Sequence, residues 1–146
     1  MSNASAPKMI FVNLPVKDLS ASIAFYEAVG AVANKDFADD SAQMLSFSDS
    51  IHVMLLTHER FTSFTPRRIP DAHETAQVLL ALSEVNREQV DVTTGKALAA
   101  GGTEPNPQQD HGFMYGRSFA DLDGHIWEVT WMDLEAALAA NKEATA

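Results

Sequence analysis

The fold is decided by a stretch that begins at Asp18 and ends at Gly30, with the sequence DLSASIAFYEAVG. Asp18 suits an N-cap, because its side-chain oxygen can accept a hydrogen bond from a free N–H group of the first turn. Leu19, Ile23 and Tyr26 recur on one helical stripe. Gly30 suits the left-handed position that follows a helix end. The stretch therefore predicts an amphipathic helix that ends at a glycine.

Short strands are expected on both sides of this helix. The segment Met9–Val16 before it is rich in strand-forming residues. Three further candidates follow, at Val32–Phe37, Met44–Ser48 and Ile51–Thr57. The stretch from 58 to about 74 contains several prolines and has no clean period, which predicts a connection.

The second half of the chain repeats this order. Gln77–Leu82 is a near-continuous apolar run and predicts a strand buried on both faces. Asn86 and Gln89 resemble a capping box before a helix from about 87 to 100, which ends at Gly101. The remaining expected elements are strands at Thr103–Glu104, Phe113–Ala120 and His125–Trp131, and a C-terminal helix from Asp133.

The internal duplication is the most informative feature of the sequence. Gly30 and Gly101 lie 71 positions apart, and the last strands, around Leu55 and Val129, lie 74 apart. We therefore predict an α+β fold of two βαβββ units that form a cupped mixed sheet with the helices outside. Residues 1–146 would form one domain, with unit one at about 8–58, a linker at 59–73, unit two at 74–131 and a C-terminal helix at 133–143.

Composition and charge limit the possible functions. A chain of 146 residues with 46% hydrophobic and 21% charged residues is typical of a globular domain and excludes wholesale disorder. The absence of cysteine excludes disulfides, thiolate metal sites and a cysteine nucleophile. A net charge of −10 argues against nucleic acid and anionic membranes as partners. Because the first residues lack a secretion-signal pattern and no stretch is long enough to span a membrane, we expect a cytoplasmic protein.

Three stretches resemble the vicinal oxygen chelate superfamily, which includes glyoxalase I, bleomycin-resistance proteins and extradiol dioxygenases. They are the strand-to-helix entry Leu14–Glu27, the second helix end Ala97–Gly102, and the hairpin Phe119–Val129 with its Asp-x-Asp-Gly turn. Residues 110–119 are similar to a predicted glyoxalase-related branch. The resemblance covers nearly the whole chain and implies a ligand site inside the cup.

The resemblance also implies four metal-ligand positions, two in each unit. They fall at Phe11, Met54, Leu79 (or Gln77, if the register shifts by two) and Glu128. Only Glu128 is a competent ligand for the divalent ions of this family. We therefore predict no metal at the usual site and no cofactor. The alternative is a divalent ion at a rearranged site, where His52 and His111 would converge with Glu128.

Glu128 is the one candidate catalytic residue. Inside an apolar cup its carboxylate could act as a general base, or it could anchor a cationic or hydroxyl group. Alternatively, it could be satisfied by Tyr115, Asn13 or Arg117, because an unpaired buried carboxylate is costly. Phe11 and Met54 could line a pocket for a flat apolar ligand or could pack as part of the core. The candidate ligand-binding residues are Phe11, Asn13, His52, Met54, Gln77, Leu79, His111, Tyr115 and Arg117.

Three functions are compatible with these residues. The first is a small-molecule-binding protein of this superfamily without the usual metal site. The second is an enzyme, similar to lactoylglutathione lyase or to extradiol dioxygenases, that uses Glu128 with a rearranged metal site. The third is a dimeric interaction module without a ligand. For partners, we expect a small molecule and a second copy in a homodimer, with no nucleic acid and no membrane.

Overall fold

A computed structural model describes residues 7–145 and divides the chain between Pro70 and Asp71 into two compact units, here called unit 1 and unit 2. Most of the N-terminal stretch that we analysed for a secretion signal therefore lies outside the described residues. In the described part of the chain, no helix is both long enough and apolar enough to span a membrane.

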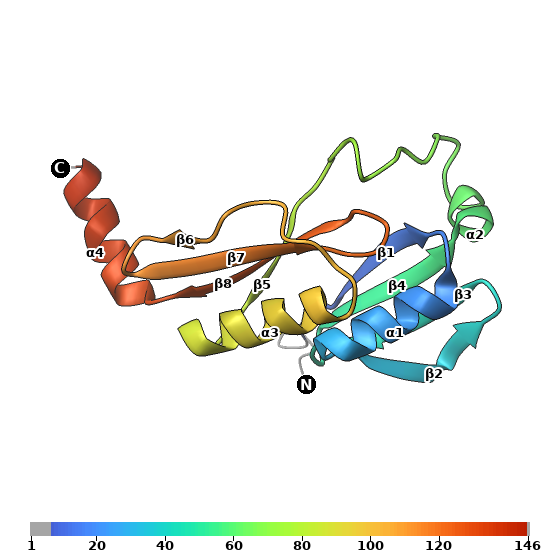
Figure 1. Cartoon of the computed structure of the whole chain (residues 1–146), viewed down its shortest axis with the longest axis horizontal. Helices are drawn as coiled ribbons and strands as arrows, with labels where there is room; N and C mark the ends of the chain where they lie inside the picture. Colours follow the sequence, from blue (N-terminus) through green and yellow to red (C-terminus); the bar gives the residue numbers. More distant parts are fainter. Residues whose placement is uncertain (1–6, 146) are drawn as a thin grey trace, which may run out of the picture. The chain divides into compact units, whose positions relative to one another are not determined.

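Unit 1 is a mixed four-stranded sheet with one long helix. Its elements are β1 (Ile10–Val16), α1 (Leu19–Val29), β2 (Val32–Asp39), β3 (Ala42–Ser46), β4 (Ile51–Thr57) and the short α2 (His58–Thr62). The strand order is β1-β4-β3-β2, with β1 parallel to β4 and the other pairs antiparallel (Figure 1).

Unit 2 repeats this topology. Its elements are β5 (Leu80–Ser83), α3 (Arg87–Ala99), β6 (Gln109–Asp110), β7 (Met114–Ala120), β8 (Ile126–Met132) and α4 (Leu134–Thr145). The strand order β5-β8-β7-β6 matches that of unit 1, and β5 is parallel to β8. The predicted duplication and the α+β class are confirmed.

The helix caps form as their residue types predict. The carboxylate of Asp18 accepts a hydrogen bond from the Ala21 N–H at 3.1 Å, and Gly30 adopts a φ of 119° directly after α1. The Asn86 side chain accepts from the Gln89 N–H at 2.8 Å, which starts α3. These caps fix where the chain leaves a strand to become a helix.

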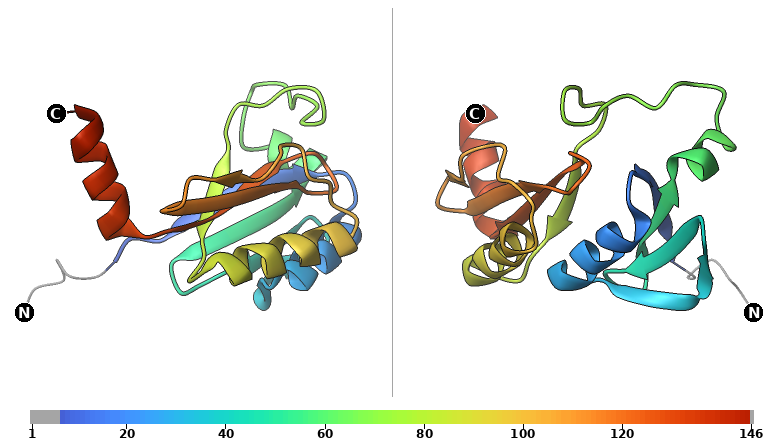
Figure 2. Two further views of the ribbon diagram at one scale, coloured as in Figure 1. Left: turned by 60° about the vertical axis from the view of Figure 1, so that its left-hand side comes forward. Right: turned by 45° about the vertical axis from the view of Figure 1, so that its right-hand side comes forward.

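Each unit has its own core between its sheet and its long helix. In unit 1, α1 packs on the sheet and buries the aromatic rings of Phe25 and Tyr26. In unit 2, α3 lies along β7 and β8 (Figure 2). The rings of Phe119 and Trp127 stack there with centroids 6.4 Å apart and are almost fully buried. Because side chains alternate along a strand, every second residue of these strands points away from the helix. We call that side the open face.

Several expectations about the elements need correction. The apolar run before α3 is not buried on both faces: Val78 is 63% exposed and Leu79 is 53% exposed. Strand β5 begins only at Leu80, and its burial alternates, as expected of a strand covered by a helix on one face. The expected strand at Thr103–Glu104 is a single bridge from Thr103 to Ala120.

The connection after β4 also differs from the prediction, because it contains a short helix. Residues 58–62, expected to be irregular, form the helix α2 because the Thr57 hydroxyl accepts from the Arg60 N–H at 3.2 Å and caps it.

Candidate functional site

A shallow pocket of about 180 Å³ lies on the open face of unit 2. Strands β7 and β8 form its floor with Gly116, Ser118, Glu128 and Thr130, and Met114 lies at one end. Its wall comes from the segment before β7, through Asn106, Pro107 and Gln109, and Arg117 also borders it.

Two oxygen-bearing side chains face each other across the pocket floor. Ser118 and Glu128 are directly paired in the β7–β8 ladder, which places their Cβ atoms about 5 Å apart. Ser118 is 4% exposed, and its hydroxyl has no hydrogen-bond partner among residues 7–145. Glu128 is half-buried, and within the same residues its carboxylate makes no hydrogen bond or ion pair. A buried hydroxyl without a partner, as at Ser118, is uncommon in folded proteins and needs an explanation.

The hairpin turn sets which residues reach the pocket floor. Asp121 is buried, and one of its carboxylate oxygens accepts from the Asp123 and His125 N–H groups at 3.0 and 2.9 Å. Gly124 has a φ of 95°, and a Cβ there would lie 2.7 Å from the backbone of Ala72. The turn therefore fixes the β7–β8 register, and with it the pairing of Ser118 with Glu128.

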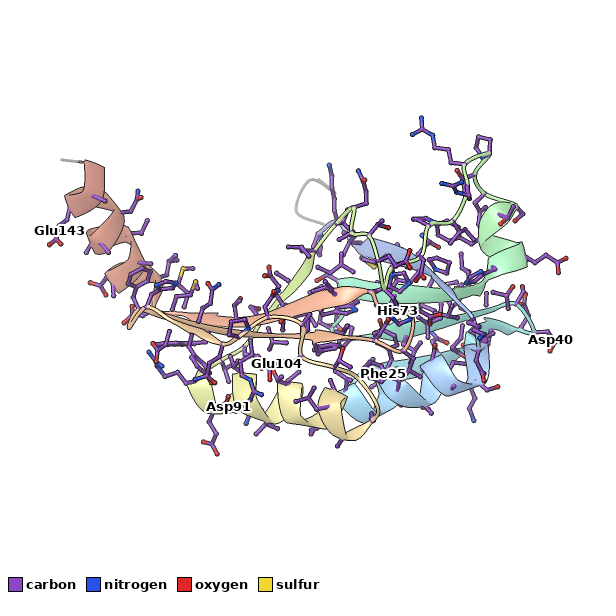
Figure 3. The ribbon with its side chains drawn as sticks, turned by 45° about the horizontal axis from the view of Figure 1, so that its top comes forward. Phe25, Asp40, His73, Asp91, Glu104 and Glu143 are labelled. Carbon is purple, nitrogen blue, oxygen red and sulfur yellow. The ribbon has the colours of Figure 1, made fainter. Side chains whose placement is uncertain are left out.

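The side chains of Arg117 and Tyr115 point to the opposite side of this sheet, toward α3, although Arg117 also borders the pocket. The Arg117 guanidinium donates two hydrogen bonds to Glu104, at 2.9 and 2.8 Å, and one to Asp91 at 3.0 Å. The Tyr115 hydroxyl donates to Asp91 at 2.6 Å. Figure 3 labels Asp91 and Glu104, the two acidic members of this cluster. Neither Arg117 nor Tyr115 therefore forms an ion pair or hydrogen bond with Glu128, although both were candidate partners for it.

The cluster shifts the pKa values of its members. The hydrogen bond from Tyr115, followed by the bond from Arg117, lowers the pKa of Asp91. The hydrogen bonds from Arg117 lower the pKa of Glu104. The pKa of Arg117 is raised, chiefly by its hydrogen bonds to Glu104. All three side chains are therefore charged at neutral pH.

A second ion pair holds in place the segment that forms the wall of the pocket. Arg87, on α3, donates to both carboxylate oxygens of Asp110 at 2.7 and 2.8 Å and to the Gly112 carbonyl at 2.8 Å. Its guanidinium also lies 5.3 Å from the ring centroids of Tyr115 and Trp131. These bonds hold the pocket wall from the α3 side of the sheet.

On the open face of unit 1, the predicted residues Phe11, Asn13, His52 and Met54 lie next to one another. Phe11 pairs with His52 in the β1–β4 ladder, and Asn13 pairs with Met54. The rings of Phe11 and His52 stack with centroids 4.8 Å apart. His52 is buried, and its ring nitrogens contact the Ser46 hydroxyl at 2.7 Å and the Asp49 carbonyl at 3.2 Å. His52 therefore packs as a hydrogen-bonded side chain of its own unit.

The remaining predicted residues lie outside the pocket lining. Gln77 and Leu79 precede β5 and are exposed. His111 lies in the turn between β6 and β7, exposed and stacked against Phe113 with ring centroids 6.4 Å apart.

The residues present do not fit the metal site that the fold implies. Of the four expected positions, two carry the hydrocarbon side chains of Phe11 and Leu79, and a third carries the Met54 thioether. Gln77, the alternative to Leu79, offers only a neutral amide. Glu128 is paired with Ala81 and Ser118, neither of which is a ligand that hard divalent ions favour. Within each unit's described residues, no group of three or more histidine, aspartate or glutamate side chains is close enough to hold an ion.

Of the residues that line this pocket, the sequence analysis named Glu128 and Arg117 as site candidates. Ser118, Gly116 and Thr130 on the strands, and Asn106 and Gln109 on the wall, were not predicted. Pairing residues outward from the predicted turn at 121–124 places Arg117 opposite Glu128. The observed connection spans 121–125, and this one-residue difference places Ser118 there instead. The wall residues carry no comparable signal, since Asn106 lies in an irregular segment and Gln109 begins a strand of only two residues.

The fold defines a class of duplicated βαβββ proteins. The model of one family matches residues 8–129, and its description is Glyoxalase/Bleomycin resistance protein/Dioxygenase superfamily. The chain belongs to this superfamily, which confirms the resemblance predicted from its sequence motifs. No curated protein matches the chain.

Solved structures share the fold. A hypothetical protein, SA1046, from S. aureus is 25% identical with a TM-score of 0.73, and the match covers 87% of this chain and 95% of that one. A glyoxalase-related enzyme from Fulvimarina pelagi is 21% identical with a TM-score of 0.72, covering 85% and 87%. The fosfomycin resistance protein FosX from Listeria monocytogenes, solved with Mn(II) and sulfate, is 19% identical with a TM-score of 0.67, covering 91% and 96%.

Proposed function

We propose that this chain is a small-molecule-binding protein whose site is the unit 2 pocket and whose binding does not require a metal. One observation carries the proposal: a buried hydroxyl and a half-buried carboxylate, Ser118 and Glu128, face each other in the pocket without partners in the described chain. Leaving the Ser118 hydroxyl unsatisfied costs free energy, so a ligand that bonds it would be stabilised, and the Glu128 carboxylate beside it offers a second, charged acceptor.

The size and lining of the pocket indicate the kind of ligand. Ligand sites commonly enclose about 300 to 1,000 Å³, and this pocket encloses about 180 Å³. A compact ligand is therefore expected, or one that extends into solvent. Met114 and Pro107 offer apolar surface beside the polar floor, a combination typical of small-molecule sites.

A blocking substitution tests the proposal. Gly116 lies on the pocket floor, where a Cβ would come within 3.2 Å of the Thr130 methyl group, so Gly116→Leu would place an isobutyl group in the pocket. Gly95→Leu is the matched control, because Gly95 is exposed on α3 and nothing lies within 4 Å of its Cβ position.

The probes are six compounds of the sizes that fit the pocket: benzylamine, benzyl alcohol and benzoate, and butylamine, butanol and butyrate. We expect at least one of them to shift the backbone amide NMR signals of residues 114–118 and 128–130 in the wild type and in Gly95→Leu, but not in Gly116→Leu. Binding that survives unchanged in Gly116→Leu, or no shift with any probe, would contradict the proposal.

A further inference from the structure

The polar groups that line the unit 2 pocket are almost all hydrogen-bond acceptors or neutral groups. Glu128 supplies a carboxylate, Ser118 and Thr130 supply hydroxyls, and the wall adds two amides. Arg117 is the one cationic residue in the lining, and its three guanidinium nitrogens are all bonded to Asp91 or Glu104. The pocket therefore carries an uncompensated negative charge.

This charge selects among ligands. An anionic ligand would lie beside the Glu128 carboxylate with no cation in the lining to offset the repulsion, on a chain whose net charge is already −10. A neutral ligand would leave the carboxylate without a counter-charge in a partly desolvated site. A cationic ligand would supply that counter-charge, and its hydrogen bonds to a carboxylate would be charge-assisted.

The geometry of the floor indicates the type of cation. An ammonium group has three N–H donors and no acceptor. Ser118 and Glu128 are paired across the β7–β8 ladder, so their oxygens can accept from two N–H groups of one nitrogen. Because the Ser118 hydroxyl is buried without a partner among residues 7–145, a donor that reaches it would remove an existing desolvation cost.

The equivalent position of unit 1 shows that this polarity is not a general property of the fold. Met44 and Met54 form the corresponding pair in the β3–β4 ladder, each 74 positions before Ser118 and Glu128. One copy of the hairpin therefore presents two thioethers where the other presents a hydroxyl and a carboxylate.

We infer that the unit 2 pocket binds a compact organic amine in its protonated form, with Glu128 as the counter-ion and Ser118 as a second acceptor. This inference rests on the proposed function and narrows it to one class of ligand. The carbon skeleton of the amine would lie against Met114 and Pro107, which are the apolar residues of the lining.

Matched probes of one skeleton test the inference. Affinities of the wild-type chain for benzylamine, benzyl alcohol and benzoate are measured by NMR titration near pH 7, where benzylamine is cationic and benzoate anionic. The butyl set repeats the comparison without an aromatic ring. We expect each amine to bind about 10-fold more tightly than its alcohol, which corresponds to about 1.4 kcal/mol, and each carboxylate to bind most weakly.

Two variants separate the local charge from the net charge. Glu128→Gln keeps the shape of the side chain but removes the pocket charge, and it should abolish the preference for amines. Glu88→Gln removes the same charge from an exposed position on α3, outside the pocket, and should leave the preference intact. Ser118→Ala should weaken binding of each amine about threefold or more while leaving the protein folded, as judged by its NMR spectrum.

The outcomes distinguish this inference from the proposed function. If amines and alcohols bind equally and Gly116→Leu abolishes both, the pocket binds ligands but the amine class is wrong. The same conclusion follows if Glu128→Gln retains the preference for amines. If Gly116→Leu leaves all binding unchanged, or no probe binds, the pocket itself is the wrong site and both proposals fail.

Discussion

Arg117 joins three parts of unit 2, and replacing it should destabilise that unit. Its side chain is 18% exposed and bridges α3 at Asp91 and the segment before β6 at Glu104, whose side chain is 25% exposed. Breaking a fully buried ion pair costs about 3 to 5 kcal/mol, whereas an exposed pair contributes about 1 kcal/mol or less. For this intermediate case we expect Arg117→Met to lower the free energy of unfolding by about 2 kcal/mol.

The assay is thermal and urea unfolding followed by circular dichroism. For a chain of this length, about 2 kcal/mol corresponds to a fall in Tm of about 4 to 8 °C. Lys96→Met is the control, because Lys96 is exposed near the end of α3 and its loss changes the net charge equally. In the double variant Glu104→Gln/Arg117→Met the two effects should not add, since the first change removes a carboxylate that the second leaves unpaired.

The pH dependence gives a further test of the same cluster. The pKa values of Glu104 and Asp91 are lower in the folded chain than in the unfolded chain. The contribution of these two carboxylates to the free energy of unfolding is therefore complete above the unfolded pKa, near 4. It is lost as the pH falls through the lowered pKa values of the folded chain. The stability gap between wild type and Arg117→Met should shrink over that range. Equal stability of the two proteins at pH 7, or a gap that does not shrink on acidification, would refute the reasoning.

Four further variants address the fold. Gly124→Ala should lower the free energy of unfolding by about 3 kcal/mol, because its Cβ would meet the backbone of Ala72 and His73 at a positive φ. Gly112→Ala, with nothing near its Cβ, should lower the free energy of unfolding by only about 1 kcal/mol. Urea unfolding midpoints would rank the two variants. Asp18→Ala should cost about 1 kcal/mol by removing the α1 cap, and an unchanged urea midpoint would contradict that role. Deleting residues 133–146 should change Tm by less than about 2 °C, because α4 makes no extensive contact with other described elements. Light scattering, which measures the molar mass in solution, would test the expected homodimer in the same deletion variant. The dimer should persist in this variant if its interface does not include α4.

The sequence was sufficient to predict the order of elements because local signals were strong. The caps at Asp18 and Asn86 and the glycine after α1 all depend on residues within one helical turn. The repeat of these signals at a nearly constant spacing then predicted the duplicated topology, which the strand orders of the two units confirm.

The site was harder to predict, because it depends on which face of a strand each residue occupies. Tyr115 and Arg117 were assigned to the ligand site. Arg117 borders the pocket, but the side chains of both residues point toward α3, where they bond to Asp91 and Glu104. A shift of one residue reverses every assignment on a strand. Ser118 was missed for the same reason, although it lies directly opposite Glu128.

The apolar run before α3 shows a different limit. Its composition favoured a strand buried on both sides, yet Val78 and Leu79 are exposed and precede the first residue of β5. Hydrophobic composition describes a residue's tendency to be buried, whereas the start of a strand depends on where its pairing with the parallel partner begins. Here Leu80 is the first residue to pair, with Trp127 of β8.

The two hairpins of this chain form an internal reference for engineering. Equivalent positions of the two hairpins carry a thioether pair, Met44–Met54, in unit 1 and an oxygen pair, Ser118–Glu128, in unit 2. Placing serine and glutamate at the two methionine positions of unit 1, or methionines at the two polar positions of unit 2, would exchange these side chains between two sheets of the same strand order. A duplicated chain of this kind can retain one half as scaffold while the other diversifies, so new specificities could arise without a change in architecture.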